Sequence, residues 1–163
     1  MGDRLFVGVL GHRNSGKSRT WNTLFGKTVR TGTRRRWLCL RENEWVEVFL
    51  VSGSPEERGK YAGGIIKGKK SRIVLCSMQY AAEVSRTLEY VTAANFDVYV
   101  QWLNPGYHDR GVYFDELGLA SRLLSAEGVL AMRSGKGSPK SRVQEISEFI
   151  YGWAKYRDLV VSG

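Results

Sequence analysis

The residues whose types and spacing most clearly suggest chemistry form the segment Gly-His-Arg-Asn-Ser-Gly-Lys-Ser at positions 11–18. The segment contains Gly11 and Gly16. Glycine reaches backbone conformations that let successive amides turn toward one anion. Lys17 supplies a compact positive charge for the β and γ phosphates, and the Ser18 hydroxyl is a ligand for Mg²⁺. The segment therefore predicts a phosphate-binding loop for a nucleoside triphosphate, GTP or ATP. The predicted nucleotide-binding residues of this stretch are Gly11, His12, Arg13, Asn14, Ser15, Gly16, Lys17, Ser18 and Arg19.

The elements on either side of this segment are those that a phosphate loop needs. Residues 5–10 form an almost continuous apolar run, which is typical of a parallel strand covered on both faces. From Lys17 the apolar spacing becomes helical, and Gly26 stands where a helix C-cap glycine is expected. The predicted helix starts at the lysine, so the positive end of its dipole faces the bound phosphates.

The rest of the chain continues with strands and helices. Two alternating runs, 37–40 and 45–51, predict an antiparallel hairpin. The glycine-rich stretch 53–70 predicts a mobile loop or a poor helix, because each interior glycine weakens a helix by about 1 kcal/mol. Further predicted strands cover 73–76, 96–103 and 129–132, and predicted helices include 116–126 and a last helix capped by Ser138 and Pro139.

This order of elements predicts an α/β fold with three layers, as in P-loop NTPases. We expect a mostly parallel six-stranded sheet with one antiparallel strand from the hairpin, and helices on both faces. The length of 163 residues matches a single nucleotide-binding domain over residues 1–163. Ligands of such sheets bind at the carboxyl ends of the strands.

The segment 11–26 resembles the opening of the Era-like, translation-factor-related GTPases. Their pattern is Gly-x-x-Asn-x-Gly-Lys-Ser, then Asn-x-Leu, a hydrophobic residue and Gly. The pattern positions beyond the bare phosphate loop are filled here by Asn14, Asn22, Leu24 and Gly26. The resemblance implies a small G-domain-like fold over nearly the whole chain. In that family the loop asparagine can help to hold K⁺ beside the phosphates; the alternative for Asn14 is that it shapes the loop.

The resemblance also implies a threonine that closes on Mg²⁺ and the γ phosphate from the first switch. Thr33 is the expected metal ligand together with Ser18, and Thr31 or Thr28 could serve instead. The second switch departs from the family pattern, because Ser52 stands where the metal-binding Asp is expected. Two readings stay open: either Glu56 or Glu57 supplies the carboxylate from a shifted register, or Mg²⁺ coordination is weakened. We favour the second.

The guanine-recognition motif of the family, Asn-Lys-x-Asp, is only half present. Asn104 matches, but Tyr107 stands where the aspartate is expected and Asp109 comes two residues late. Loss of a bidentate contact to the base removes strict discrimination between GTP and ATP, and Tyr107 could stack on either base. The last base-contacting element resembles Ser134, Gly135 and Lys136, which we add to the predicted nucleotide-binding residues.

Positive charge is concentrated in a few segments of the chain. The formal net charge is +9, and much of it lies in segments 27–36, 58–72 and 133–142. A basic surface attracts nucleic acid, an acidic protein or anionic lipid, or it is simply a solvated face. The segments 27–36 and 58–72 fall where the family has its switches, so we expect an acidic partner, nucleic acid or protein, at these two.

The composition bounds the setting of the chain. No apolar stretch is long enough to span a bilayer, and no signal-peptide pattern is present, so we expect a cytoplasmic protein without a transmembrane segment. Cys39 and Cys76 lie in apolar runs and are expected to be buried.

These observations favour a GTPase-like switch that binds a nucleoside triphosphate, hydrolyses it slowly with Mg²⁺, has relaxed base specificity and presents a basic surface. The first alternative is a non-catalytic pseudo-GTPase that acts as an interaction module. A small P-loop kinase is a further alternative, which the hairpin after the first helix disfavours. No catalytic base is identified, and His12 and His108 are expected to be surface histidines. By proximity alone, arginines that could stabilise phosphoryl transfer are Arg13, Arg19, Arg34, Arg35 and Arg36.

Overall fold

The computed structural model of the chain describes residues 2–32 and 34–163, so the predicted metal ligand Thr33 lies outside the described residues. The strands are β1 Arg4–Gly11, β2 Arg36–Arg41, β3 Glu44–Val51, β4 Ile73–Gln79, β5 Phe96–Leu103, β6 Val129–Arg133 and β7 Val161–Ser162. The helices are α1 Lys17–Phe25, α2 Ala62–Ile66, α3 Val84–Ala93, α4 Leu119–Ser125 and α5 Lys140–Tyr156.

The strands form one mixed sheet with the order β2-β3-β4-β1-β5-β6, and β7 pairs with β3. The pairs within β3-β4-β1-β5-β6 are all parallel, whereas β2 and β7 both run antiparallel to β3. The predicted α/β class and mostly parallel sheet are confirmed. The predicted strand number is wrong, because the described residues form seven strands rather than six. The two-residue strand β7 is too short to leave a periodic pattern.

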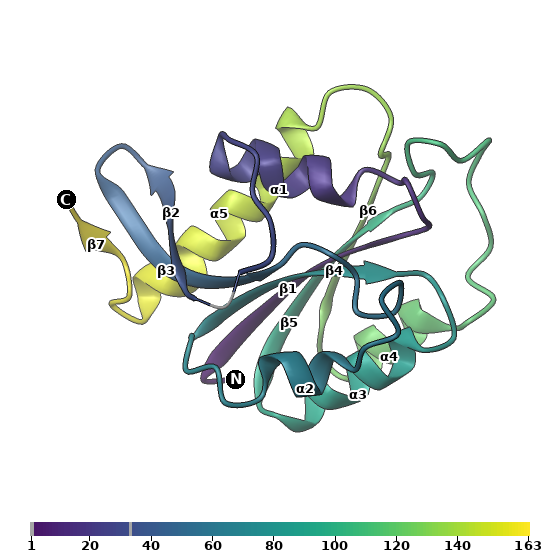
Figure 1. The fold of residues 1–163 in the computed structure, drawn as a ribbon, viewed down its shortest axis with the longest axis horizontal. Helices are drawn as coiled ribbons and strands as arrows, with labels where there is room; N and C mark the ends of the chain where they lie inside the picture. Colours follow the sequence, from purple (N-terminus) through teal and green to yellow (C-terminus); the bar gives the residue numbers. More distant parts are fainter. Residues whose placement is uncertain (1, 33) are drawn as a thin grey trace.

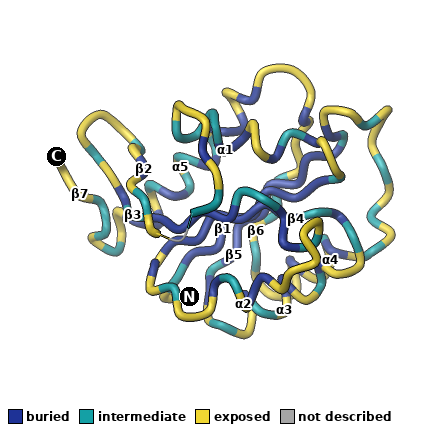
Figure 2. Tube along the Cα trace, in the orientation of Figure 1, coloured by how far each residue is buried: buried dark blue, intermediate teal, exposed yellow. Residues whose placement is uncertain are grey.

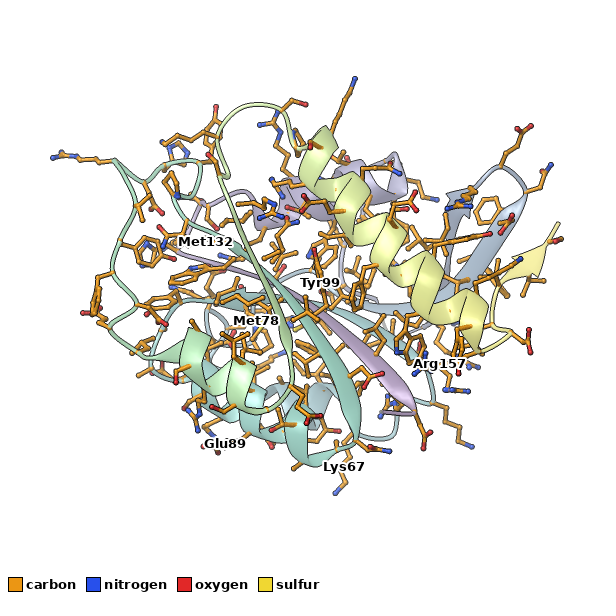
Figure 3. The ribbon with its side chains drawn as sticks, turned by 180° about the vertical axis from the view of Figure 1, so that it is seen from behind. Lys67, Met78, Glu89, Tyr99, Met132 and Arg157 are labelled. Atoms are coloured by element: carbon orange, nitrogen blue, oxygen red, sulfur yellow. The ribbon has the colours of Figure 1, made fainter. Side chains whose placement is uncertain are left out.

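Helices cover both faces of the sheet, with α1 and α5 on one face and α2, α3 and α4 on the other (Figure 1). Alternate residues of β1 point into two separate cores: Val7 packs with Trp21 and helix α5, while Phe6 packs with helices α2, α3 and α4. Tyr99 and Met78 belong to these two cores and are labelled in Figure 3. Burial on both faces explains the continuous apolar run of β1.

The exposed parts of the chain lie at the ends of the strands and along the β2–β3 hairpin, while the central strands are buried (Figure 2). Cys76 is buried as expected, but the expectation for Cys39 is wrong because this residue is exposed. Cys39 lies on an edge strand whose outer face no helix covers. None of the helices in residues 2–32 and 34–163 is long and apolar enough to cross a membrane.

One predicted helix is shorter than expected, and one weak helix is observed as predicted. Helix α4 begins at Leu119 rather than at residue 116, because Gly118 has a positive φ of 66° and the Asp115 carboxylate accepts the amide hydrogens of Leu119 and Ala120. The glycine-rich stretch 53–70 contains only the five-residue helix α2, which fits the prediction of a poor helix.

Candidate functional site

Three loops that follow β1, β5 and β6 meet at the carboxyl ends of these strands (Figure 1). The amide of Tyr107 donates to the carbonyl of Ser15 at 3.0 Å, and the amide of Gly135 donates to the carbonyl of Pro105 at 2.7 Å. A Cβ atom on Gly135 would lie 3.0 Å from the Tyr107 nitrogen, so a larger residue would push the loops apart. The loops that contain residues 11–16, 104–118 and 134–139 therefore form one packed edge.

A cavity of about 460 Å³ opens at this edge. Its lining includes Arg13–Arg19 of the predicted nucleotide-binding residues, whereas Gly11 and His12 lie behind it. The remaining lining comes from Ser52, Gly53, Ser54, Glu57, Tyr107 and His108. The buried hydroxyls of Ser15 and Ser54, each in a residue only 1% exposed, have no hydrogen-bond partner among the described residues. Buried hydroxyls are normally paired, so these two are exceptions within the described residues.

Two residues of the β1–α1 loop have a backbone in the left-handed region. Asn14 has φ 60° and Gly16 has φ 106°, so both lie in the left-handed region. Alternation of such residues with ordinary ones turns successive amides toward a common point. Asparagine is one of the few residues with a side chain that adopt this region readily. The positive φ at position 14 gives Asn14 a role in shaping the loop.

Lys17 begins helix α1, and its ammonium group is held by the loop itself. Lys17 Nζ donates to the carbonyl of Gly11 at 3.1 Å and to that of His12 at 2.8 Å. The Glu57 carboxylate lies 3.6 Å from Nζ. Burial lowers the pKa of Lys17, and the charge of Glu57 opposes that shift. The lysine charge is thus buried at the cavity wall with one carboxylate beside it.

The two adjacent glutamates that sequence reasoning left open have different surroundings. Glu57 lines the cavity and approaches Lys17. The carboxylate of Glu56 instead accepts the amide of Gln79 at 3.4 Å and the hydroxyl of Thr87 at 3.0 Å. Burial raises the pKa of Glu56. Of the two, Glu57 is the carboxylate that a ligand in the cavity would meet.

Ser52, at the position expected for an aspartate, connects the cavity to the segment before β2. Its hydroxyl accepts the amide of Thr31 at 2.8 Å, and Thr31 Oγ1 accepts the amides of Ser52 at 2.7 Å and Gly53 at 3.3 Å. Thr31 is therefore used in holding the chain together rather than aimed at a metal. The described residues contain no group of three His, Cys, Asp or Glu side chains that could hold a metal ion by themselves.

The predicted base-contacting residues are brought near the loop, but only some face the cavity. Asn104 is buried, and its side-chain amide both donates to and accepts from the backbone of Tyr113 at 2.9 Å. Asp109 accepts the amide of Gly106 at 2.7 Å and lies 3.4 Å from His12 Nδ1. Both side chains hold the 104–118 loop. Neither is among the residues that line the cavity.

Tyr107 is an aromatic ring of this loop that lines the cavity. It is 48% exposed, and the Arg19 guanidinium lies 5.9 Å from its ring centre. Lys136 Nζ donates to the carbonyl of Tyr107 at 3.0 Å, and the amide of Lys136 donates to the Ser134 hydroxyl at 3.1 Å. The segment 134–136 thus supports Tyr107 from behind, and it does not line the cavity.

The two histidines differ in exposure. His12 stacks on Tyr113 with ring centres 3.8 Å apart, and its side chain is 39% exposed, so it lies at the surface against an aromatic ring. The imidazole belongs to an aromatic cluster that includes Tyr113 and Tyr80. In this cluster Trp102 Nε1 donates to the Tyr113 hydroxyl at 2.7 Å. His108 is exposed as expected and lines the cavity.

Arg142 is a residue of the site that sequence reasoning missed. It is 5% exposed, and its guanidinium donates to the hydroxyl of Thr20 and to Gln101 Oε1. A Cβ atom on Gly16 would lie 3.4 Å from Arg142 Nη2, so this cation is directly behind the loop. Burial lowers its pKa to about 10, and the nearby charge of Arg19 adds to the shift. Within the described part of the chain it has no carboxylate partner, so an anion in the loop would stabilise it.

One signal could have identified Arg142 from the sequence. It lies four residues before Ile146 on the inward face of α5, where an apolar residue is expected.

No protein-family model matches the chain, and no curated protein matches it significantly. The residues at the carboxyl edge of the sheet and their geometry are therefore the basis for a functional interpretation.

Proposed function

We propose that the chain binds a nucleoside triphosphate with its phosphates in the β1–α1 loop and acts as a divergent switch of the Era-like GTPase type. The observation that carries this proposal is Lys17, whose buried ammonium group is held on the carbonyls of Gly11 and His12 beside the cavity. A phosphate oxygen can replace Glu57 as the partner of this cation. The buried Arg142, which has no carboxylate partner among the described residues, also supports an anionic ligand.

Mg²⁺ fits the residues at the cavity in part. Ser18 and Glu57 offer one hydroxyl and one carboxylate, and Mg²⁺ is commonly bound through one or two carboxylates together with substrate phosphates and water. The ion would neutralise charge that develops on the phosphates during hydrolysis. Arg13 and Arg19 line the same cavity and carry the charge that could assist. Turnover is expected to be slow, because Ser52 replaces the usual aspartate. A K⁺ ion beside Asn14 remains part of the proposal through the family resemblance alone.

Relaxed base specificity follows from the residues near Tyr107. Selection of guanine requires a buried carboxylate that pairs with the base edge. The carboxylate of Asp109 is occupied by Gly106 and His12, while Tyr107 offers a ring on which either purine can stack. GTP and ATP are therefore expected to bind with similar affinity.

A non-catalytic pseudo-GTPase is the second candidate, and the contacts of Ser52 favour it. The hydroxyl of Ser52 and that of Thr31 satisfy one another and the adjacent amides, which leaves neither free to coordinate Mg²⁺ without breaking this link. In this case the chain would bind a nucleotide without cleaving it. A kinase is supported least, since a β-hairpin follows α1 where kinases carry helices and an acceptor site.

The test is equilibrium binding of GTP, ATP and their diphosphates with and without Mg²⁺, followed by measurement of phosphate release. The Lys17→Ala variant is expected to lose triphosphate binding. Lys67→Ala is the matched control, because Lys67 is exposed between α2 and β4, away from the loops at the carboxyl edge (Figure 3). Unchanged affinity of Lys17→Ala would refute the site. A preference for GTP over ATP of about tenfold or more would refute relaxed specificity, and binding without phosphate release would favour the pseudo-GTPase.

A further inference from the structure

The outer face of the β2–β3 hairpin carries two exposed tryptophans that the phosphate site does not use. Trp37 is 52% exposed and Trp45 is 36% exposed, although tryptophan is a residue that folding usually covers. In the β2–β3 register Trp37 lies opposite Glu47 and Trp45 lies opposite Cys39, so the two indoles are diagonal neighbours on one face. Val161 of β7 pairs with Trp45. We call Trp37, Trp45 and Val161 the tryptophan platform.

Cationic side chains border the platform on one side. A hollow of about 600 Å³ is lined by Trp37 and Trp45 together with Lys27, Gly32, Arg34, Arg35 and Arg36. A second hollow of about 430 Å³ is lined by the same two tryptophans with Val161, Ser162 and Gly163. The two indoles therefore separate a cationic hollow from an apolar one.

Most of the charge in the cationic hollow is not neutralised by carboxylates of the described residues. Arg35 pairs with Glu47 at 2.7 Å, and Arg36 donates to the carbonyl of Arg30 at 2.5 Å. For Lys27 and Arg34 the described residues provide no carboxylate partner. These two exposed cations, beside flat aromatic surfaces, match an anionic partner that also has an apolar face.

We propose that the tryptophan platform and the cations of residues 27–36 bind single-stranded nucleic acid. Its bases are flat and stack on exposed aromatic rings, and its phosphates provide one negative charge per nucleotide, which matches a cationic hollow next to an apolar one. A duplex presents its bases only in its grooves, so stacking on the platform favours single strands. This inference goes beyond the proposed function and does not require triphosphate binding; it narrows the acidic partner expected at residues 27–36 to single-stranded nucleic acid.

The test uses fluorescence anisotropy with labelled oligo(dT) and oligo(U) of about 12 nucleotides, a length within the range that such surfaces cover. Trp37→Ala and Trp45→Ala are each expected to weaken binding by roughly 5- to 150-fold, the effect of one lost stacking contact. The Phe variants at both positions are expected to retain most of the affinity, since a ring remains. Tyr156→Ala is the matched control, because Tyr156 is 76% exposed at the end of α5, away from both hollows.

Salt dependence separates phosphate contacts from stacking. For single strands the slope of log affinity against log salt changes by about 0.7 for each phosphate contact. Arg34→Ala is therefore expected to reduce the slope by about 0.7, whereas Trp37→Ala leaves it unchanged. Arg122→Ala serves as the control, since Arg122 lies on α4, pairs with Glu89 and lines neither hollow.

Cys39 reports the location of bound oligonucleotide. It is exposed, and it pairs with Trp45 in the β2–β3 register, so both lie on the same face of the hairpin. The other cysteine of the sequence, Cys76, is buried. Bound oligo(dT) is expected to slow alkylation of Cys39 by iodoacetamide. An unchanged alkylation rate at saturating oligonucleotide would place the binding elsewhere and overturn the proposal.

The other outcomes are equally decisive. Absence of oligonucleotide binding at low salt would overturn the proposal, and so would binding that is insensitive to both tryptophan variants. Tighter binding of poly-glutamate than of oligo(dT), with the same dependence on Trp37, would indicate an acidic protein instead. Lys17→Ala is expected to bind oligo(dT) normally, so failure of the triphosphate site and failure of the platform are distinguished by different variants.

Discussion

Glu57→Gln is the substitution that best tests the charge arrangement of the site. The Glu57 carboxylate lies 3.6 Å from Lys17 Nζ, in the cavity that the phosphates would enter. In the free protein it stabilises the buried lysine, and in the complex it faces the negative charge of the phosphates. Removal of its charge therefore destabilises the free state and relieves repulsion in the complex. Both effects favour binding when no metal is present.

The expected magnitude follows from the distances at the site. Two unit charges about 4 Å apart interact by about 4 kcal/mol at an effective dielectric constant of about 20. The Glu57 side chain is 32% exposed, so solvent screening reduces this considerably. We expect about 1–2 kcal/mol, which is a gain in affinity of roughly 5- to 30-fold for GTP in the absence of Mg²⁺.

Mg²⁺ is expected to reverse the order of GTP affinity between the wild type and Glu57→Gln. If Glu57 replaces the missing aspartate as a metal ligand, Mg²⁺ tightens GTP binding by the wild type more than by Glu57→Gln. The assay is calorimetric titration of GTP with Mg²⁺ and with a chelator, and Glu42→Gln is the control because it removes the same charge from an exposed position in the turn between β2 and β3. Equal affinities of wild type and Glu57→Gln without metal would refute the electrostatic reasoning. An equal gain from Mg²⁺ in both would refute the ligand role.

Two further substitutions test the base side of the cavity and the buried carboxylate behind it. Tyr107→Ala is expected to weaken the binding of GTP and of ATP by the same factor, roughly 5- to 150-fold for a lost stacking contact. Competition binding checks this, and a loss confined to one nucleotide would contradict relaxed specificity. Burial raises the pKa of Glu56 above its ordinary value of 4.5. The stability that protonated Glu56 contributes is full below about pH 4.5 and is lost as pH rises through the folded-state pKa. Urea unfolding of the wild type and of Glu56→Gln gives the difference between their unfolding free energies at each pH. This difference, wild type minus variant, is expected to fall as pH rises above 4.5. A constant difference would exclude titration of Glu56 as its source.

The β1–α1 region could be predicted in detail because everything it requires is local in sequence. The apolar run of β1, the loop and the helix occupy consecutive residues 4–25, and the left-handed conformations fall on Asn14 and Gly16, which tolerate them. The order of parallel strands and helices likewise followed from patterns within each element.

Contacts between distant residues could not be predicted in this way. Glu56 and Glu57 are adjacent, yet the turn at 55–59 directs one to Thr87 and the other to Lys17. No periodic pattern distinguishes two neighbouring residues in a turn. Arg142 is separated from Thr20 by more than a hundred residues, and only the packing of α5 against α1 brings them together. The exposure of Cys39 depends on whether another layer covers β2, which the pattern of β2 alone does not reveal.

The link between Ser52 and Thr31 connects the two binding surfaces that we propose. Ser52 and Gly53 line the phosphate cavity, and both are held to Thr31 by hydrogen bonds between backbone amides and hydroxyls. Thr31 lies in the segment that leads into Arg34–Trp37, so a movement of Ser52 toward a bound phosphate either carries this segment with it or breaks the three bonds, at about 1 kcal/mol each. In both cases we expect the position of the cations beside the tryptophan platform to depend on whether the cavity is occupied. Coupling of this kind is reciprocal. If a bound triphosphate changes the affinity for oligonucleotide by some factor, bound oligonucleotide changes the affinity for triphosphate by the same factor.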